Sequence, residues 1–310
     1  DKKEFGWNQL SLSEQKIING LETHKIPAYL GYRRSFTEGI KRLGSDVKPV
    51  FALLEVASAC NIKCPFCFQS DPTFTKKEFM GLIDTNFALE VIDQVDQLKI
   101  RGITIASRGE PLLCNDLCKI LEYISTKDNI LEIKLNTNAK RLTKDKLKEI
   151  LKTKVNILVV STDHYEKQKY EEYRHGSNYE NFINNISNIK PLREELGRIN
   201  NLYTRACGVA VDTQMDENKY DLFYQKFFDE SGVVKIWERW DTYNNEPDQH
   251  NLGSCGLPFE RLYIWYDGTI NPCDADYKSY LSPGSLKNMT LQESWIKLGN
   301  LRQKMLDGKR

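Results

Sequence analysis

From about residue 50 onward, the sequence alternates six times between short β-rich runs and amphipathic helical stretches. The expected strands are residues 50–57, 102–107, 130–136, 156–162, 201–212 and 232–238. The expected helices lie near residues 84–98, 112–125, 143–152, 179–195 and 217–230. Such alternation is typical of parallel βα units. We therefore predict an α/β fold, a partial (β/α)6 TIM-like barrel, with reactive groups at the carboxyl ends of its strands.

Two further segments flank the predicted barrel of residues 50–239. Residues 1–49 contain helical stretches near 11–22 and 33–44, and we expect an N-terminal helical extension. A polar, turn-rich segment at 240–254 marks a second boundary. Residues 240–310 are then expected to form a small module of a β-hairpin, turning at Asp267-Gly268, and a helix. Since the chain ends in mid-pattern at Arg310, we expect that the natural protein extends further.

The charge balance argues against several classes of partner. There are 44 Lys and Arg residues against 43 Asp and Glu, so the net charge is +1 and no global basic field attracts nucleic acid or an anionic membrane. No run of about 18 apolar residues is present. The first residues lack the order of a signal peptide. We therefore expect a cytoplasmic protein, where clustered cysteines are more often metal ligands or catalytic groups than disulfides.

Three of the eight cysteines fall within eight residues, as Cys60, Cys64 and Cys67, directly after the first expected strand. Structural zinc takes four protein ligands, and no histidine is near this group. The three thiolates could instead each bind a different iron of a [4Fe–4S] cluster and leave the fourth iron open. A zinc or iron–sulfur scaffold without catalytic activity, or chance placement, remains the alternative.

The segment "CNIKCPFC" resembles the C-x3-C-x2-C motif of the radical SAM superfamily. The resemblance implies that the three cysteines hold a [4Fe–4S] cluster whose open iron is chelated by S-adenosylmethionine. It also implies that electron transfer into the sulfonium releases a 5′-deoxyadenosyl radical, with flavodoxin or ferredoxin as the external electron donor. Phe66, the aromatic residue before the third cysteine, fits the family pattern and is counted as cofactor-binding.

Three further segments resemble family elements at strand ends. Gly109, Glu110 and Pro111 look like the GGEP element, although Arg108 replaces its first glycine. The resemblance implies that Glu110 accepts a hydrogen bond from the methionine ammonium. "KLNTNAKRLT" and "VVSTDH" resemble the segments after the third and fourth strands, which implies cofactor contacts from Asn136, Asn138, Ser161 and Asp163. For each of these residues, a solvated polar strand end is the alternative interpretation.

Cys255 and Cys273 bracket the expected hairpin. This arrangement resembles the SPASM or twitch module, in which C-x17-C, an Asp-Gly turn and "PC" recur. The resemblance implies an auxiliary iron–sulfur cluster ligated by these two cysteines. Further ligands would follow the helix that begins near Leu291, so the module is expected to be truncated or degenerate. Two buried cysteines in a hairpin are the alternative.

Candidate substrate residues lie on the fifth and sixth expected strands. Arg205 and Cys207 share one face of the fifth strand. If that face points into the barrel, Arg205 could clamp an anionic or polyol substrate and Cys207 could donate a hydrogen atom to a substrate radical. A buried packing thiol is the alternative for Cys207. Glu238 and Asp241 are candidate binding or proton-transfer groups, though a surface loop would have the same composition.

The predicted function is that of a radical SAM oxidoreductase acting on a polar small molecule such as a sugar, nucleotide sugar or aminocyclitol. Enzymes with a similar module include sugar alcohol and aminocyclitol dehydrogenases, which favours oxidation of an alcohol. Peptide-modifying members commonly carry a winged-helix domain that binds the leader peptide, and 49 residues before the barrel are few for one. A peptide maturase and a sugar epimerase that uses Cys207 remain the enzymatic alternatives.

Overall fold

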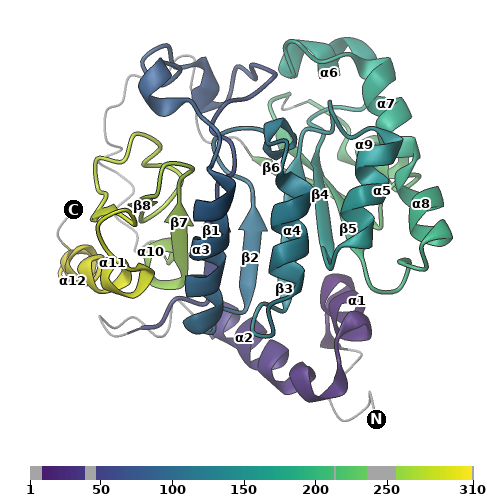
Figure 1. The fold of residues 1–310 in the computed structure, drawn as a ribbon. Helices are drawn as coiled ribbons and strands as arrows, with labels where there is room; N and C mark the ends of the chain where they lie inside the picture. The colour runs from purple at the N-terminus through teal and green to yellow at the C-terminus, as the bar shows by residue number, and fades with distance from the viewer. Residues whose placement is uncertain (1–8, 39–46, 213, 236–255, 309–310) are drawn as a thin grey trace.

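The structure is a computed structural model and describes residues 9–38, 47–212, 214–235 and 256–308. Within these residues the centre is one nine-stranded sheet, in the order β6-β5-β4-β3-β2-β1-β7-β8-β9 (Figure 1). The first six strands are β1 (Phe51–Leu54), β2 (Gly102–Ile105), β3 (Glu132–Thr137), β4 (Ile157–Ser161), β5 (Tyr203–Ala210) and β6 (Glu230–Lys235). All six pair in parallel. The predicted α/β fold is confirmed, and the barrel is partial because the sheet does not close.

Strands β1 to β4 are largely buried on both faces, as expected for a parallel sheet covered by crossover helices. Their outward side chains, such as Leu54, Ile105 and Leu135, join a core with the helices. The inward side chains, such as Phe51 and Val159, form a second cluster. The helices of the βα units are α3 (Thr85–Gln97), α4 (Leu117–Ser125), α5 (Lys144–Lys152), α6 (Lys167–Tyr173), α7 (Tyr179–Ser187), α8 (Ile189–Glu195) and α9 (Glu217–Tyr224).

Helix α3 shows how the local sequence specifies these elements. The Asp84 side chain accepts a hydrogen bond from the backbone N–H of Phe87 at 2.9 Å and so caps the first turn. Val91, Ile92 and Val95 recur at helical spacing and are completely buried against the sheet. The helix predicted here is confirmed.

The helix predicted for residues 179–195 is wrong as a single element, because it is divided between α7 and α8 at Asn188. Pro191 explains the break. Its ring would collide with the carbonyl four residues earlier, at Ser187, and it has no N–H to donate there. The helix predicted from residue 112 also begins later, at Leu117, because Pro111–Leu113 forms the 3-10 turn η7.

The N-terminal segment closes the amino-terminal end of the barrel. It consists of α1 (Leu12–Gly20), the 3-10 turn η3 (Thr23–Lys25) and α2 (Ile26–Glu38), which lie below the sheet in Figure 1. Ile17, Tyr29 and Tyr32 pack in one cluster with Phe51 and Ile157 from the strands. The second helix begins at Ile26 and not near residue 33 as predicted. These helices therefore form the floor of the barrel.

The C-terminal segment extends the same sheet. It contains α10 (Leu257–Glu260), β7 (Arg261–Ile264), β8 (Thr269–Asn271), β9 (Gly284–Ser285), α11 (Leu291–Lys297) and α12 (Gly299–Leu306). β7 and β8 pair antiparallel around the predicted turn, where Gly268 has a φ of +88° that favours glycine. The hairpin is thus confirmed. β7 also pairs in parallel with β1, so the hairpin continues the barrel sheet.

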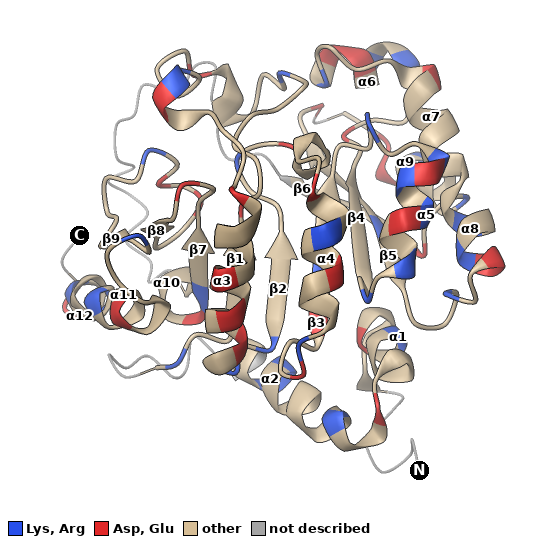
Figure 2. Cartoon of the chain, viewed as in Figure 1, with Lys and Arg blue, Asp and Glu red and all other residues tan. Residues whose placement is uncertain are grey.

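Charges of both signs are interspersed along the outer helices (Figure 2). This agrees with the balanced composition of the chain. In the part of the chain that the structure describes, no helix is long and apolar enough to cross a lipid bilayer.

We predict that Tyr32→Phe destabilises the fold by about 1–3 kcal/mol, because a buried carboxylate loses a hydrogen-bond donor. The Tyr32 hydroxyl donates to Oε1 of Glu132 at 3.1 Å, and both residues are buried beneath the sheet. Urea unfolding of the intact chain measures the change. Tyr280→Phe is the matched control, since Tyr280 is 75% exposed. Equal stability of Tyr32→Phe and the parent would show that α2 does not depend on this bond.

Candidate active site

The three clustered cysteines lie in the loop that follows β1 and leads to the 3-10 turn η5 (Phe68–Ser70). The loop turns back on itself, since the Cys67 N–H donates to the carbonyl of Cys64 at 3.0 Å. Cys60, Cys64 and Cys67 are all free thiols. All three line a pocket of about 280 Å³ at the carboxyl ends of the parallel strands. The sequence prediction that they lie where β1 ends is confirmed.

Gly109 allows the second strand to reach this loop. A Cβ at this position would lie 2.5 Å from the carbonyl oxygen of Ala57 and 2.2 Å from that of Ala59. Contacts this short with backbone atoms cannot be relieved by moving a side chain, so only glycine fits. The close approach also lets the Glu110 N–H donate to the Ala59 carbonyl at 2.9 Å.

The Glu110 side chain links the ends of β2 and β3. Its Oε1 accepts from the Thr137 hydroxyl at 2.6 Å and from the Leu112 N–H at 3.1 Å, and its Oε2 accepts from the Asn138 N–H at 2.7 Å. Burial raises the pKa of Glu110, and these three hydrogen bonds act in the opposite direction. The carboxyl group lines the pocket. The contact of Glu110 with an ammonium group stays a prediction. The hydrogen bonds to Thr137 and Asn138 show in addition that Glu110 positions the end of β3.

Asn136 and Asn138 also line the pocket. The Asn138 amide nitrogen donates to Asn61 Oδ1 at 2.8 Å and lies 3.8 Å from the Cys60 sulfur, within hydrogen-bonding reach. Asn136 Oδ1 is buried and has no hydrogen-bond partner. Ala139, which follows Asn138, has a φ of +59°, the left-handed conformation in which glycine is preferred.

Asp163 and Arg174 form a buried ion pair at the wall of the pocket. Arg174 Nη2 lies 2.8 Å from Asp163 Oδ2, and the side chains are 6% and 0% exposed. Asp163 also accepts from the Val209 N–H at 2.8 Å. Burial raises the pKa of Asp163, and Arg174 acts against that rise. The Nε of Arg174 is buried without a partner, so this cation keeps a donor available beside the cysteines.

The donor set fits an iron–sulfur cluster better than a single metal ion. Within the described ranges, no group of three or more cysteine, histidine or carboxylate side chains converges closely enough to hold one ion. A zinc ion needs all of its sulfur ligands about 2.3 Å from one centre. In a cluster, by contrast, each thiolate binds a different iron. Burial raises the pKa of all three thiols, so binding of iron must displace their protons.

Arg108 holds the pocket against the C-terminal segment. Its Nη2 lies 2.6 Å from Glu55 Oε1 and its Nε donates to Oε2 of the same carboxylate at 2.8 Å. Its Nη1 donates to the Tyr277 carbonyl at 2.8 Å, and its guanidinium carbon lies 4.3 Å from the centre of a Trp265 ring. The residue that replaces a family glycine thus joins β1, β2 and the C-terminal hairpin through one buried cation.

The pocket brings together most of the predicted site residues. Those that line it are Cys60, Cys64, Phe66, Cys67, Gly109, Glu110, Asn136, Asn138, Ser161, Asp163 and Cys207. Pro111 and Cys273 are not among the lining residues, and Arg205 lies deeper along β5. Glu238, Asp241 and Cys255 fall outside the described residues. Their predicted roles, including ligation of an auxiliary cluster by Cys255 and Cys273, remain predictions.

Arg174 is a pocket residue that the sequence analysis missed. It follows α6 and is 11 positions beyond Asp163, in "YRHGSN", with no recognisable motif around it. Only the packing of α6 against the strand ends brings its guanidinium to the cysteines. A buried arginine was not expected there, because arginine is mostly exposed in proteins.

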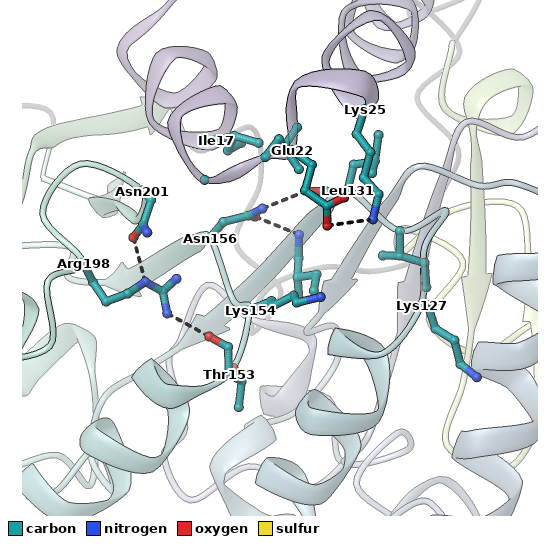
Figure 3. A pocket seen from close by; sticks show the side chains of 14 residues that line it. Ile17, Glu22, Lys25, Lys127, Leu131, Thr153, Lys154, Asn156, Arg198 and Asn201 are labelled. Atoms are coloured by element: carbon teal, nitrogen blue, oxygen red, sulfur yellow. Dashed lines mark hydrogen bonds and ion pairs between the residues drawn. The ribbon is translucent and has the colours of Figure 1, made fainter.

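A second cavity, of about 300 Å³, lies at the opposite end of the barrel, next to α1 and η3 (Figure 3). Its polar groups are engaged with one another. Arg198 donates to the carbonyls of Leu151, Thr153 and Val155, and Asn156 donates to that of Leu131. This cavity contains no cysteine. These contacts join the loop after α8 to the segment between α5 and β4, and the start of β4 to the start of β3.

Part of the chain matches the model of a known protein family. Residues 54–196, which include the cysteine loop and the strands β2 to β4, match the model of the Radical SAM superfamily. GTP 3′,8-cyclase of Limosilactobacillus fermentum is 27% identical over 158 residues. That match covers 48% of this chain and 44% of the relative, so the chain spans less than half of the relative's length.

Two solved structures share the fold. BtrN, in complex with AdoMet and 2-DOIA, has a TM-score of 0.54 at 15% identity and covers 84% of this chain and 88% of BtrN. Streptococcus suis SuiB, bound to the precursor peptide SuiA, has a TM-score of 0.65 at 15% identity and covers 87% of this chain and 70% of SuiB. At this identity the likeness shows the fold alone.

We predict that Arg108→Met destabilises the protein by about 3–5 kcal/mol, because Glu55 is left as an uncompensated buried charge. The two side chains are 2% and 0% exposed. Denaturant unfolding under anaerobic conditions measures the change. The double variant Arg108→Met/Glu55→Leu should regain part of the loss. Lys148→Met, which removes an exposed ion pair, is the surface control, and equal losses in it and in Arg108→Met would contradict the prediction.

Proposed function

We propose that the chain is a radical SAM enzyme that removes a hydrogen atom from a polar small molecule bound in the barrel, and the match of residues 54–196 to the superfamily model supports this. The observation on which the proposal depends is the composition of one pocket. Three reduced thiols, a buried carboxylate, a buried arginine with an unpartnered donor and the thiol of Cys207 meet there.

The residues present suit the cofactors of this family, a [4Fe–4S] cluster and S-adenosylmethionine. Cys60, Cys64 and Cys67 would hold three irons. When bound, these cofactors supply a 5′-deoxyadenosyl radical that takes a hydrogen atom from an unactivated carbon. An external electron donor such as flavodoxin or ferredoxin would provide the electron.

The polar residues of the pocket have distinct roles in this proposal. Arg174 offers positive charge and a free Nε–H to the carboxylate of S-adenosylmethionine. Asn136 Oδ1, which is buried and unpartnered, would accept a hydrogen bond from a cofactor or substrate hydroxyl. Glu110 holds the ends of β2 and β3 in register and presents its carboxyl group to the pocket.

A polar small molecule is favoured over a peptide by the inner face of the sheet. The floor helices close the barrel below, and polar side chains on β3 to β5 point into its interior. The solved neighbours do not separate the two substrate classes, since one binds 2-DOIA and the other a precursor peptide. We assign a two-electron oxidation of an alcohol. In this reaction the substrate radical would lose a proton to a basic side chain and an electron to an auxiliary iron–sulfur cluster, which Cys273 would help to hold.

Epimerisation is a second candidate, favoured by the position of Cys207. Its thiol lines the same pocket as the three cluster cysteines, and Ser161 on β4 pairs with it across the sheet. In this reaction the S–H of Cys207 returns a hydrogen atom to the opposite face of the substrate radical. The resulting thiyl radical must then gain one electron and one proton from the external donor and solvent.

We predict that Cys64→Ala abolishes the formation of 5′-deoxyadenosine from S-adenosylmethionine, because one of three cluster ligands is lost. Anaerobic reconstitution with iron and sulfide, followed by dithionite and chromatographic detection of the nucleoside, measures it. Cys118→Ala is the matched control, since Cys118 lies on α4 outside the pocket. If the parent forms no 5′-deoxyadenosine, or if Cys64→Ala forms as much as the parent, the proposed function is wrong.

The two reaction outcomes differ in the fate of solvent deuterium. Oxidation should leave no deuterium at the reacting carbon of the product, whereas epimerisation in D2O should introduce one deuterium from the exchanged thiol of Cys207. Mass spectrometry of the product reads the label. Deuterium that appears with the parent enzyme and disappears with Cys207→Ala would replace oxidation by epimerisation as the assigned reaction.

A further inference from the structure

The inner face of the sheet carries three cations beneath the cysteine pocket. Lys134 lies on β3, Arg205 on β5 and Arg261 at the start of β7. Lys134 precedes Asn136 by two residues and Arg205 precedes Cys207 by two, and both Asn136 and Cys207 line the pocket. Because side chains two positions apart on a strand point to the same face, Lys134 and Arg205 lie one step deeper in the barrel than the pocket wall.

The register of the sheet places Lys134 and Arg205 on the same face, two strands apart and offset by two residues along the strands. β4 alone separates β3 from β5, and Val159 on β4 pairs with Asn136 on one side and with Arg205 on the other. The guanidinium of Arg205 lies over Gly232 on β6, where an added Cβ would come within 3.2 Å of Nη2. Glycine at this position thus leaves room for the arginine to lie inside the barrel.

The cations influence one another electrostatically. Burial lowers the pKa of Lys134; Glu132 and Cys207 act in the opposite direction, and the positive charges of Arg261 and Arg205 add to the lowering. Lys134 therefore lies inside the barrel and is still partly exposed to solvent.

The nearest carboxylates form no ion pair with Lys134 or Arg205 in the described part of the chain, although Glu132 offsets part of the Lys134 charge and Glu230 pairs with Arg205 across the two strands. Glu132 accepts hydrogen bonds from Tyr29, Tyr32 and Arg33 of the floor. Glu230 accepts from the Tyr203 hydroxyl.

Asp274 lies near Arg261 and compensates part of its charge. In the described part of the chain, the ion pairs and side-chain hydrogen bonds do not include Lys134 or Arg205, and Arg205 Nε is buried without a partner. Largely buried cations without a direct hydrogen-bond or ion-pair partner are costly, and an anion bound between Lys134 and Arg205 would supply that partner.

We propose that Lys134 and Arg205, flanked by Arg261, form a subsite for an oxyanion group of the substrate, phosphoryl or carboxylate. The inference rests on the proposed function, since it places the substrate in the same barrel. The planar fork of Arg205 can donate two parallel hydrogen bonds to an oxyanion, and Lys134 adds a compact positive charge. The substrate class thereby narrows from polar molecules in general to anionic ones, such as a sugar phosphate or nucleotide sugar.

Binding of simple anions to the reconstituted protein tests the subsite. Inorganic phosphate and malonate are titrated by calorimetry at constant ionic strength, with S-adenosylmethionine bound. We expect binding of at least one anion by the parent protein, and a loss of tenfold or more in affinity in both Lys134→Gln and Arg205→Gln. Preference for phosphate or for malonate distinguishes a phosphoryl group from a carboxylate. Lys154→Gln is the matched control, since Lys154 lines the cavity at the opposite end of the barrel.

The location of the anion provides a second measurement that does not depend on a variant folding. Crystals of the parent protein are soaked in arsenate, whose anomalous scattering should give a peak between Lys134 Nζ and the Arg205 guanidinium. A peak only at the opposite cavity, a loss of affinity only in Lys154→Gln, or no anion binding by the parent protein would overturn the proposal. Formation of 5′-deoxyadenosine is assayed on the same samples. Nucleoside formation without anion binding rejects the subsite alone, and anion binding without nucleoside formation rejects the proposed function alone.

Discussion

The parallel register of β1 to β5 is the constraint on which the rest of the structure depends. Parallel strands end at one edge of a sheet, so the residues that follow them meet whatever their distance in the sequence. The cysteine loop after β1, Glu110 after β2 and Asp163 after β4 are gathered in this way. The hydrogen bonds of Glu110 to Thr137 and Asn138 then fix β3 relative to β2. The position of the pocket is therefore determined by the strand order and register of the sheet more than by the conformation of any one loop.

Features that depend on a short stretch of residues could be predicted from the sequence alone. The position of the cysteine group after the first strand, the alternation of strands and helices and the Asp267-Gly268 turn each depend on a few consecutive residues, and these three features were predicted correctly. The break between α7 and α8 is local too, because Pro191 was visible in the sequence and was given too little weight. The inward position of Lys134 could also have been predicted, because in "EIKLN" it alternates with Ile133 and Leu135, which are buried on the opposite face.

The remaining features depend on contacts that no pattern in one sequence records. The pairing of Arg174 with Asp163 follows from how α6 packs on the strand ends. Arg108 replaces the first glycine of the element that this segment resembles. It contacts Glu55, Trp265 and Tyr277, and Tyr277 is 169 residues away in the sequence. The N-terminal helices were expected as an extension, but their apolar side chains complete the inner cluster of the barrel. Such roles can be identified only once the chain is folded.

The position of β7 has a consequence for how the chain can be divided. β1 is a short, fully apolar strand, "FALL", and β7 covers the edge that β2 leaves unpaired. An apolar strand with an open edge is a template for pairing with a second molecule. A protein cut after β6 would thus leave this edge of β1, a largely buried strand, open to pairing with other molecules. The C-terminal hairpin protects that edge, and it therefore cannot be exchanged between proteins as an independent cassette.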